Sequence, residues 1–359
     1  MSVQVSYKKQ FTFFFILLLI ILIVVELSVR TIESIEDPCN DWKKETKVFE
    51  KYHPELVKQI CIDLHAKPEK YDGIRLEPPN YHSPTLNINS DGFRGPEISK
   101  EKLDGTYRIF LIGGSTTFGF GATSDETTIS GFLQKFFNDS DLNVNIEVIN
   151  AGIEAGYSSS EAYYIKNILV EYTPDLIIAY DGWNDSSDVA VVERVQSSDF
   201  DIRQILFYKT PFFIYERIIG YPDREEVFSN QPQDFATKRA DMWKNNWIEM
   251  CKLGKENNFK TIVTVQPILN TGNKILSPFE LSLLEIQPVE INFGLRGLNE
   301  FVQTFDELNQ ECAATEDLRN TFDGISEPVY WDVGHMSDSG NELVAKRLYD
   351  LALPIVLEK

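Results

Sequence analysis

The stretch YRIFLIGGSTTFG, residues 107–119, contains a short apolar run, two glycines and a serine in succession. An apolar run of this length that ends in Gly-Gly is typical of a buried strand followed by a tight turn. Beyond the turn, from Ile129 to Phe137, apolar residues fall at the spacing i, i+3, i+4, i+7 and i+8, which is typical of an amphipathic helix. The stretch therefore predicts a strand, a turn that presents Ser115, and a helix.

The same alternation continues along the chain. Further strands are predicted at 146–150, 175–180, 260–265 and, more weakly, 329–333; further helices are predicted near 162–169, 240–257 and 340–352. Strands that alternate with helices form a mostly parallel sheet with helices on both faces. Five such strands predict an α/β protein with a flavodoxin-like three-layer α/β/α sandwich, whose reactive crevice lies at the carboxyl ends of the strands.

A long apolar segment near the N-terminus predicts a transmembrane anchor. Residues 11–29 include only three polar side chains, and a helix of this length spans about one hydrocarbon core. No small-residue cleavage site follows, so an uncleaved anchor is favoured over a cleaved secretory signal. Lys8 and Lys9 precede the segment. By the positive-inside rule, residues 1–10 form a cytoplasmic tail and the rest of the chain lies outside the cytoplasm.

The charge of the chain excludes some partners. There are 34 Lys and Arg residues against 55 Asp and Glu, a formal net charge of −21. Coulomb repulsion opposes the binding of nucleic acid to such a chain. No CxxC pair and no Cys/His cluster is present, so neither a metal nor a cofactor is predicted.

The four cysteines receive two different interpretations. Cys39 and Cys61 lie just after the apolar segment and are candidates for a disulfide, as befits an extracytoplasmic location. Cys251 and Cys312 each fall on an apolar helical stripe and are interpreted as small core residues.

Polar residues follow four of the five predicted strands. The segments are GGSTTFG (113–119), NAGIEAGYSSS (150–160), DGWND (181–185) and DVGH (332–335). Because the carboxyl ends of parallel strands meet at one edge of the sheet, these segments are expected to form one site.

The residue types at this edge suit nucleophilic acyl transfer. Ser115 is the predicted nucleophile, at a helix N-terminus that favours developing negative charge. His335, the only histidine after residue 82, is the predicted base, and Asp332 orients it. The predicted oxyanion hole consists of the backbone N–H groups of Ser115 and Gly156 and the side-chain amide of Asn184.

These segments, in this order, resemble the blocks of the SGNH (GDSL-type) hydrolase family over roughly residues 107–352. The resemblance implies a flavodoxin-like sandwich, esterase or acyltransferase activity, and family residues at Ser115, Gly156, Asn184 and His335, with Asp332 in the D-x-x-H motif. The upstream NINSDGFRGPE (87–97) resembles the segment before the first block in membrane-anchored members, and QPILN (266–270) resembles their fourth-strand loop.

The chain departs from the family pattern at three places. The Asp of the GDS motif is replaced by Gly114. The second block, NAGIEAG, has one residue more than NAGxxG, so either Gly152 or Gly156 could supply the oxyanion amide; Gly156 is favoured. The insertion at 186–240 has no counterpart, and its apolar stretch 204–218 is interpreted as a packed helix pair rather than an acyl-binding lid.

The predicted organisation is an anchor at 11–29, a juxtamembrane stalk or subdomain at 30–104, and a hydrolase-like domain at 105–359. The predicted function is that of a membrane-anchored extracytoplasmic serine esterase or acyltransferase acting on O-acyl esters of envelope glycans or lipids. The alternative is a non-catalytic module that binds envelope polysaccharide or a partner protein.

Trp183, beside Asn184, is interpreted as either a pocket or a core residue. A nucleotide phosphate loop at 113–121 is excluded, because no GK[ST] sequence follows.

Overall fold

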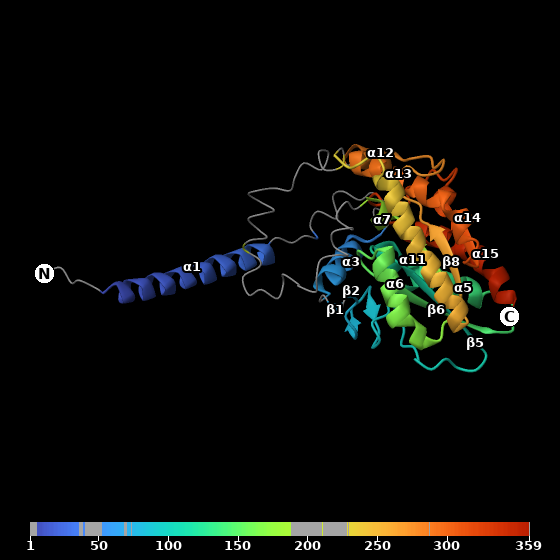
Figure 1. Ribbon diagram of the computed structural model, residues 1–359, viewed down its shortest axis with the longest axis horizontal. Coiled ribbons are helices and arrows are strands. Elements are labelled where there is room, and N and C mark those ends of the chain that lie inside the picture. The colour runs from blue at the N-terminus through green and yellow to red at the C-terminus, as the bar shows by residue number, and fades with distance from the viewer. Residues whose placement is uncertain are drawn as a thin grey trace.

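A parallel sheet with helices on both faces forms the centre of the protein (Figure 1). The computed structural model describes residues 6–35, 39, 52–67, 70–72, 74–187, 210, 228, 230–286 and 288–358. The strands of the sheet are β5 (Thr106–Gly113), β6 (Asn145–Gly152), β7 (Leu176–Asp181), β8 (Lys260–Val265) and β9 (Ala314–Asp317). Their spatial order is β6-β5-β7-β8-β9 and every neighbouring pair is parallel. In chain order this is 2-1-3-4-5, which confirms the predicted flavodoxin-like sandwich.

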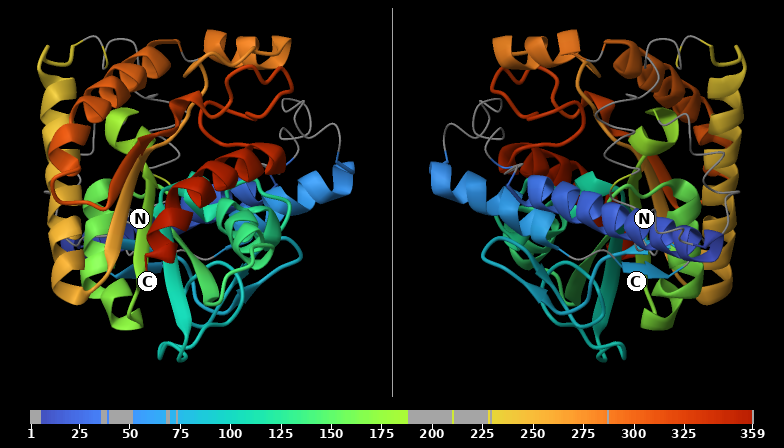
Figure 2. Two further views of the ribbon diagram at one scale, coloured as in Figure 1. Left: turned by 90° about the vertical axis from the view of Figure 1, so that its right-hand side faces the viewer. Right: turned by 90° about the vertical axis from the view of Figure 1, so that its left-hand side faces the viewer.

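Two helical layers cover the sheet (Figure 2). One face packs against α6 (Ser158–Asn167), α11 (Phe235–Asn257) and α13 (Pro288–Gln303), and the other against α5 (Ile129–Asn138) and α15 (Asp338–Leu357). Successive side chains of a strand point to opposite faces. Phe110 and Ile112 of β5 therefore join the first core, and Ile109 and Leu111 join the second. This central strand is buried along its whole length, as expected for a parallel sheet.

Shorter elements complete the layers. They are α4 (Ser115–Phe118), α7 (Trp183–Ser187), α12 (Pro278–Ile286), α14 (Phe305–Leu308) and 3₁₀ helices at Asp125–Thr127, Leu169–Tyr172 and Leu318–Asn320.

The fifth strand was predicted in the wrong place. The sequence predicts it at 329–333, whereas the fifth strand is β9, whose side chains are all only partly buried. An edge strand of this kind lacks the apolar run that marks a central strand. Val329 and Tyr330 are apolar for another reason, because they lie buried in the second core as part of a loop. Tyr330 forms only an isolated bridge, with Met336.

The segment that precedes the sandwich, described within residues 52–97, shares a core with it. It contains α3 (Pro54–Ala66) and two small antiparallel pairs, β1 (Lys70–Asp72) with β2 (Ile74–Leu76) and β3 (Tyr81–His82) with β4 (Asn87–Ile88). Ile60 and Ile88 pack in one cluster with Phe118 of α4 and with Trp331. The segment predicted as a stalk or subdomain therefore packs, over its described residues, directly on the helix that carries Ser115.

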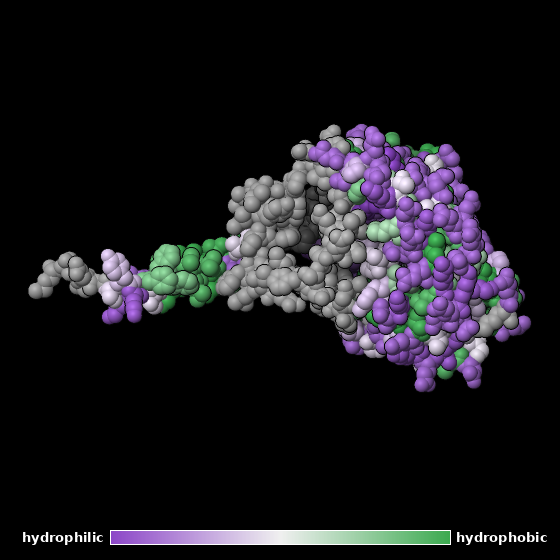
Figure 3. Space-filling view, in the orientation of Figure 1, coloured by the Kyte–Doolittle hydropathy of each residue, from purple (hydrophilic) through white to green (hydrophobic). Residues whose placement is uncertain are grey.

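The N-terminal helix α1 (Tyr7–Ile35) extends away from the sandwich, and the apolar side chains between Phe11 and Val25 are exposed on its surface (Figures 1 and 3). Its residues Tyr7–Ile32 are long and apolar enough to cross a membrane, with a mean hydropathy of 2.9 over the most apolar window. Near its C-terminal end, Glu26 accepts hydrogen bonds from the N–H and the hydroxyl of Thr210, at 2.9 and 2.8 Å. Apart from Thr210, the stretch 204–218 lies outside the described residues.

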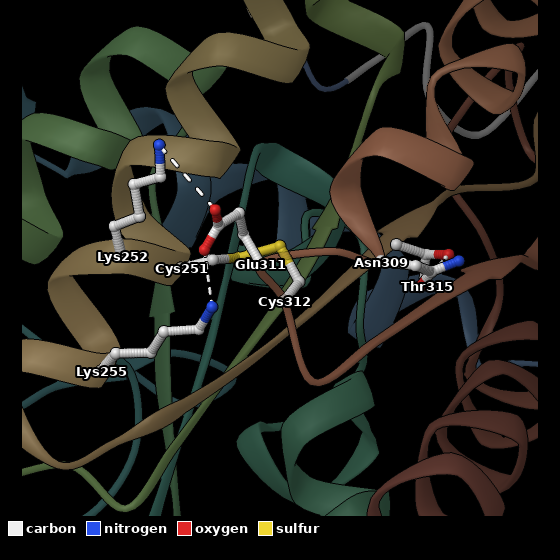
Figure 4. The surroundings of a disulfide bond; sticks show 7 residues. All are labelled: Cys251, Lys252, Lys255, Asn309, Glu311, Cys312 and Thr315. Carbon is white, nitrogen blue, oxygen red and sulfur yellow. Dashed lines mark hydrogen bonds and ion pairs between the residues drawn. A yellow bond between two sulfur atoms is a disulfide. The ribbon is translucent and has the colours of Figure 1, made fainter.

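All four cysteines are paired. The Cys39–Cys61 disulfide confirms the prediction for that pair. The other two lie in the core, as interpreted, and they are also bonded to each other, Cys251 of α11 to Cys312 just before β9, a pairing that the sequence analysis left open. Both are indeed buried, but the apolar stripes do not show that these segments pack side by side. The Glu311 carboxylate lies between the ammonium groups of Lys252 and Lys255 beside this bond (Figure 4).

Candidate active site

Ser115 is placed at the carboxyl edge of the sheet by a very tight turn. The helix α4 begins at Ser115, directly after β5, with Gly114 as its N-cap. A Cβ atom on Gly113 would lie 2.1 Å from the carbonyl oxygen of Tyr180, and one on Gly152 would lie 2.1 Å from the N of Phe118. Glycine at both positions therefore lets α4 approach β6 and β7 closely enough to present the hydroxyl of Ser115 at this edge.

The structure brings three of the predicted residues together in one hydrogen-bonded series. The Nε2 of His335 lies 2.8 Å from the Oγ of Ser115, and the Nδ1 of His335 lies 2.6 Å from the Oδ2 of Asp332. Both distances are those of hydrogen bonds. With Nδ1–H bonded to the carboxylate, Nε2 is the acceptor for the serine proton, so the series has the arrangement of a nucleophile, a base and a group that orients the base.

Asp332 is fixed by its own loop. Its Oδ1 accepts hydrogen bonds from the backbone N–H of Gly334 at 2.8 Å and of His335 at 2.6 Å. Burial raises the pKa of Asp332, but the neighbouring imidazole of His335 and these hydrogen bonds outweigh it, and the net pKa lies below its ordinary value. Asp332 is therefore a carboxylate at neutral pH, as the stabilisation of an imidazolium requires.

Aromatic rings fix the plane of the imidazole. The ring of Trp331 stacks on that of His335, with 5.0 Å between centroids and 20° between planes. The ring of Phe120 lies 4.8 Å from the imidazole on a tilted plane. The sequence gives little sign of these contacts, because Phe120 and Trp331 come from different turns.

Asn184 points its amide at the edge beside Ser115. It lies in α7, directly after β7, and its Nδ2 donates to the carbonyl oxygen of Gly156 at 2.7 Å. A primary amide carries two N–H bonds, so one remains for a bound oxyanion. A Cβ on Gly114 would lie 2.8 Å from this nitrogen, which places the amide close to the N-terminus of α4. Since Ser115 is the first residue of that helix, its own N–H has no intrahelical acceptor.

Gly156 has a different role from the predicted one. Its N–H donates to the carbonyl oxygen of Ile153 at 2.9 Å and so closes a turn. The alternative candidate, Gly152, donates its N–H to the Oδ1 of Asn150 at 3.0 Å. Both amides are thus used within their own segment, and Gly156 contributes its carbonyl group, which orients Asn184. NAGIEAG has one residue more than the motif NAGxxG, and this residue lies in the turn. Counting positions along the shorter motif therefore did not predict the hydrogen bond of the Gly156 N–H.

A cavity of about 270 Å³ opens over these groups. Its lining includes Ser115, Asn184 and His335, together with Trp183 and Gln266. Gln266 directly follows β8 and was missed as a site residue, although its place at the end of a predicted strand was a usable signal. Trp183 serves both of the roles considered for it: it lines the cavity, and a Cβ on Gly294 would lie 2.3 Å from its ring.

A buried group of carboxyls lies next to the α7 segment. Asp185 accepts hydrogen bonds from the N–H and the hydroxyl of Ser158, at 2.8 and 2.6 Å, and so ties α7 to the start of α6. Burial, and then the charge of Asp185, raises the pKa of Asp181 to about 8. Burial likewise raises the pKa of Glu161, with Asp181 and Asp185 adding to the effect. The sequence did not predict that these carboxyl groups are buried together, because their burial depends on tertiary packing.

Potential metal ligands gather at one place in the described part of the chain, at Cys39, Cys61 and His65. The two sulfur atoms of that group are joined to each other, so they are not available as thiolate ligands.

Comparison with protein-family models and with curated proteins found no match. Among solved structures, the acetyl xylan esterase AlAXEase is 15% identical, with a TM-score of 0.41, and the match covers 68% of this chain and 98% of that one. The psychrotrophic esterase EstA from Pseudoalteromonas sp. is 15% identical, with a TM-score of 0.42 and coverage of 71% and 100%. The lipase/acylhydrolase from Enterococcus faecalis is 14% identical, with a TM-score of 0.41 and coverage of 68% and 95%.

Proposed function

We propose that this chain is a serine esterase or acyltransferase of the SGNH type that forms an acyl-enzyme on Ser115. The observation that carries the proposal is the continuous series of hydrogen bonds from the Oγ of Ser115 through the imidazole of His335 to Asp332. A serine hydroxyl is a weak nucleophile and needs a base within hydrogen-bonding distance.

The chemical steps follow from these positions. The Oγ of Ser115 attacks an ester carbonyl while the Nε2 of His335 takes the serine proton. His335 then gives this proton to the departing alkoxide, and an acyl group remains on Ser115. Water or a hydroxyl of a second substrate, activated by the same imidazole, releases the acyl group. In this proposal, the side-chain amide of Asn184 and the N–H of Ser115 stabilise the tetrahedral oxyanion by donating hydrogen bonds to it.

The proposed location is the outer face of a cell membrane, with α1 as an uncleaved anchor. Lys8 and Lys9, in the first turn of α1, precede its apolar stretch 11–29 and favour a cytoplasmic N-terminus. Support for an extracytoplasmic domain comes from the two disulfides, Cys39–Cys61 and Cys251–Cys312, since such bonds persist in oxidising compartments.

The proposed substrates are O-acyl esters of envelope glycans or lipids. An anchored enzyme meets such substrates at a raised local concentration. The described cavity of about 270 Å³ accommodates a short acyl group beside Ser115, and it lies at the small end of the usual range for ligand sites.

Hydrolysis of p-nitrophenyl acetate by the full-length protein in detergent tests the proposal. The wild type is expected to turn the ester over, and Ser115→Ala is expected to be inactive with an unchanged circular dichroism spectrum. Equal turnover by the folded variant, or no turnover by the wild type on any of a series of short-chain to long-chain esters, would refute it.

A further inference from the structure

The turn between β6 and α6 determines where the amide of Asn184 lies. Ile153 to Gly156 form this turn, with Glu154 and Ala155 at its centre, and Ala155 has a left-handed φ of 55°. The carbonyl group of Gly156 accepts the hydrogen bond from Asn184. A displacement of the turn would therefore displace the oxyanion donor.

Two residues of the segment 52–97, the membrane-proximal segment in the proposed topology, hold Glu154 in place. The Nζ of Lys67 lies 3.1 Å from the Oε1 of Glu154, and the backbone N–H of Glu154 donates to the Oε1 of Glu77 at 3.3 Å. Lys67 also forms an ion pair with Glu77. The side chains of Lys67 and Glu77 are each 3% exposed and that of Glu154 is 10% exposed. A cation so deeply buried is tolerated only when its partners stay in position.

The same ammonium group contacts the helix that presents the nucleophile. The Nζ of Lys67 lies 4.4 Å from the centroid of the Phe118 ring, a cation–π contact. Phe118 is the last residue of α4, three positions after Ser115. One side chain from outside the sandwich therefore contacts both the turn that orients Asn184 and the helix that carries Ser115.

We propose that Lys67 is a positioning residue, through which the membrane-proximal segment holds the oxyanion hole in its working geometry. The inference rests on the proposed function and assigns a role in it to a segment outside the SGNH-like blocks. Lys67 does not touch the reacting atoms. It acts through Glu154 and the carbonyl group of Gly156 on the amide of Asn184.

A double-mutant cycle between Lys67 and Asn184 tests the proposal, with p-nitrophenyl acetate and the full-length protein. Lys67→Met is expected to lower kcat by about tenfold to a hundredfold with little change in KM, as small misplacements of catalytic groups do. In the Asn184→Ala background, where the oriented amide is already gone, the same substitution is expected to change kcat by less than about twofold, because residues that act as a unit are not additive. Lys67→Arg, which keeps the charge, should restore most of the loss.

Arg108→Met is the matched control, because Arg108 is a buried cation at the other end of β5, paired with Glu147 at 2.6 Å. It should lower the melting temperature and leave kcat unchanged. Where Lys67→Met does not fold, Glu154→Gln replaces it in the cycle.

Two results would overturn the inference. An equal fold loss of kcat in both Asn184 backgrounds, or no loss at all, would show that Lys67 has only a structural role, while the proposed function would stand. A wild type that hydrolyses none of the short-chain to long-chain esters would overturn both.

Discussion

The Oγ of Ser115 lies 2.8 Å from the Nε2 of His335, although 220 positions separate the two residues in the chain. The contact exists because both residues lie at the same edge of the parallel sheet. Ser115 follows the strand β5, and His335 lies in the loop before α15. Two glycines let α4 turn sharply after β5, and the loop before α15 returns His335 to this edge through backbone bonds such as that from the N of Trp331 to the O of His335, at 3.1 Å.

The first prediction concerns the carboxylate that orients the base. Asp332→Asn is expected to lower kcat by up to about 10⁴-fold, because an amide can favour the wrong imidazole tautomer and cannot stabilise the imidazolium. Steady-state hydrolysis of p-nitrophenyl acetate measures the effect. Asp350→Asn, at an exposed ion pair on α15, is the control and should behave like the wild type. Full activity of Asp332→Asn would exclude the assigned role.

The second prediction concerns the oxyanion amide. Asn184→Ala is expected to reduce kcat by about 10²–10³-fold and to change KM little, because the donor acts on charge that develops only in the transition state. Asn167→Ala, which removes a side-chain hydrogen bond on the surface of α6, is the control. A rise in KM at constant kcat would instead make Asn184 a simple substrate-binding residue.

Part of this site could be predicted from the sequence. The strands β5, β6, β7 and β8 carry apolar runs around Phe110, Ile149, Ile178 and Val263. Their positions in the chain, and therefore the residues at their carboxyl ends, could be predicted. Ser115 and Asn184 were found in this way. His335 was found because it is the only histidine after residue 82, although the segment before it, predicted as a strand, is a loop. The strand β9 was missed, because an edge strand with side chains open to solvent has no apolar pattern.

Contacts between distant segments could not be predicted. The N–H of Gly156 takes part in a turn hydrogen bond with Ile153. Comparison of this segment with a motif that is one residue shorter cannot show such a bond. The bond between Cys251 and Cys312 and the burial of Lys67 depend likewise on which segments pack side by side, a property of the tertiary structure rather than of local periodicity.

The third prediction concerns the dependence of stability on pH. Burial raises the pKa of Asp181 from 3.8 to about 8 and that of Glu161 well above 4.5. A carboxyl with a raised pKa in the folded state contributes stability below its unfolded pKa, and this contribution is lost as the pH rises through its folded pKa. Above about pH 5, the melting temperature of the wild type should therefore fall more steeply with pH than that of Glu161→Gln, because the glutamine side chain does not titrate.

Glu256→Gln, on the exposed face of α11, serves as the control for this experiment and should show the slope of the wild type. If Glu161→Gln and the wild type have the same slope, burial does not raise the pKa of Glu161 in the folded protein.

The fourth prediction concerns the disulfide between α11 and the start of β9. It closes a loop with a sequence separation of 61. The double variant Cys251→Ala/Cys312→Ala is expected to lose about 2–4 kcal/mol of unfolding free energy, since the unfolded chain gains conformational freedom. Urea denaturation measures the loss. An unchanged urea midpoint would show that the bond does not constrain the chain.

Covalent labelling with a fluorophosphonate tests the central claim most directly. The probe reacts with a serine only when a base and an oxyanion hole activate it. Peptide mapping should find the label on Ser115 of the wild type, none on that peptide in Ser115→Ala, and a strongly reduced rate in His335→Ala. Label on another residue, or labelling of Ser115 at an equal rate without the imidazole, would contradict the account.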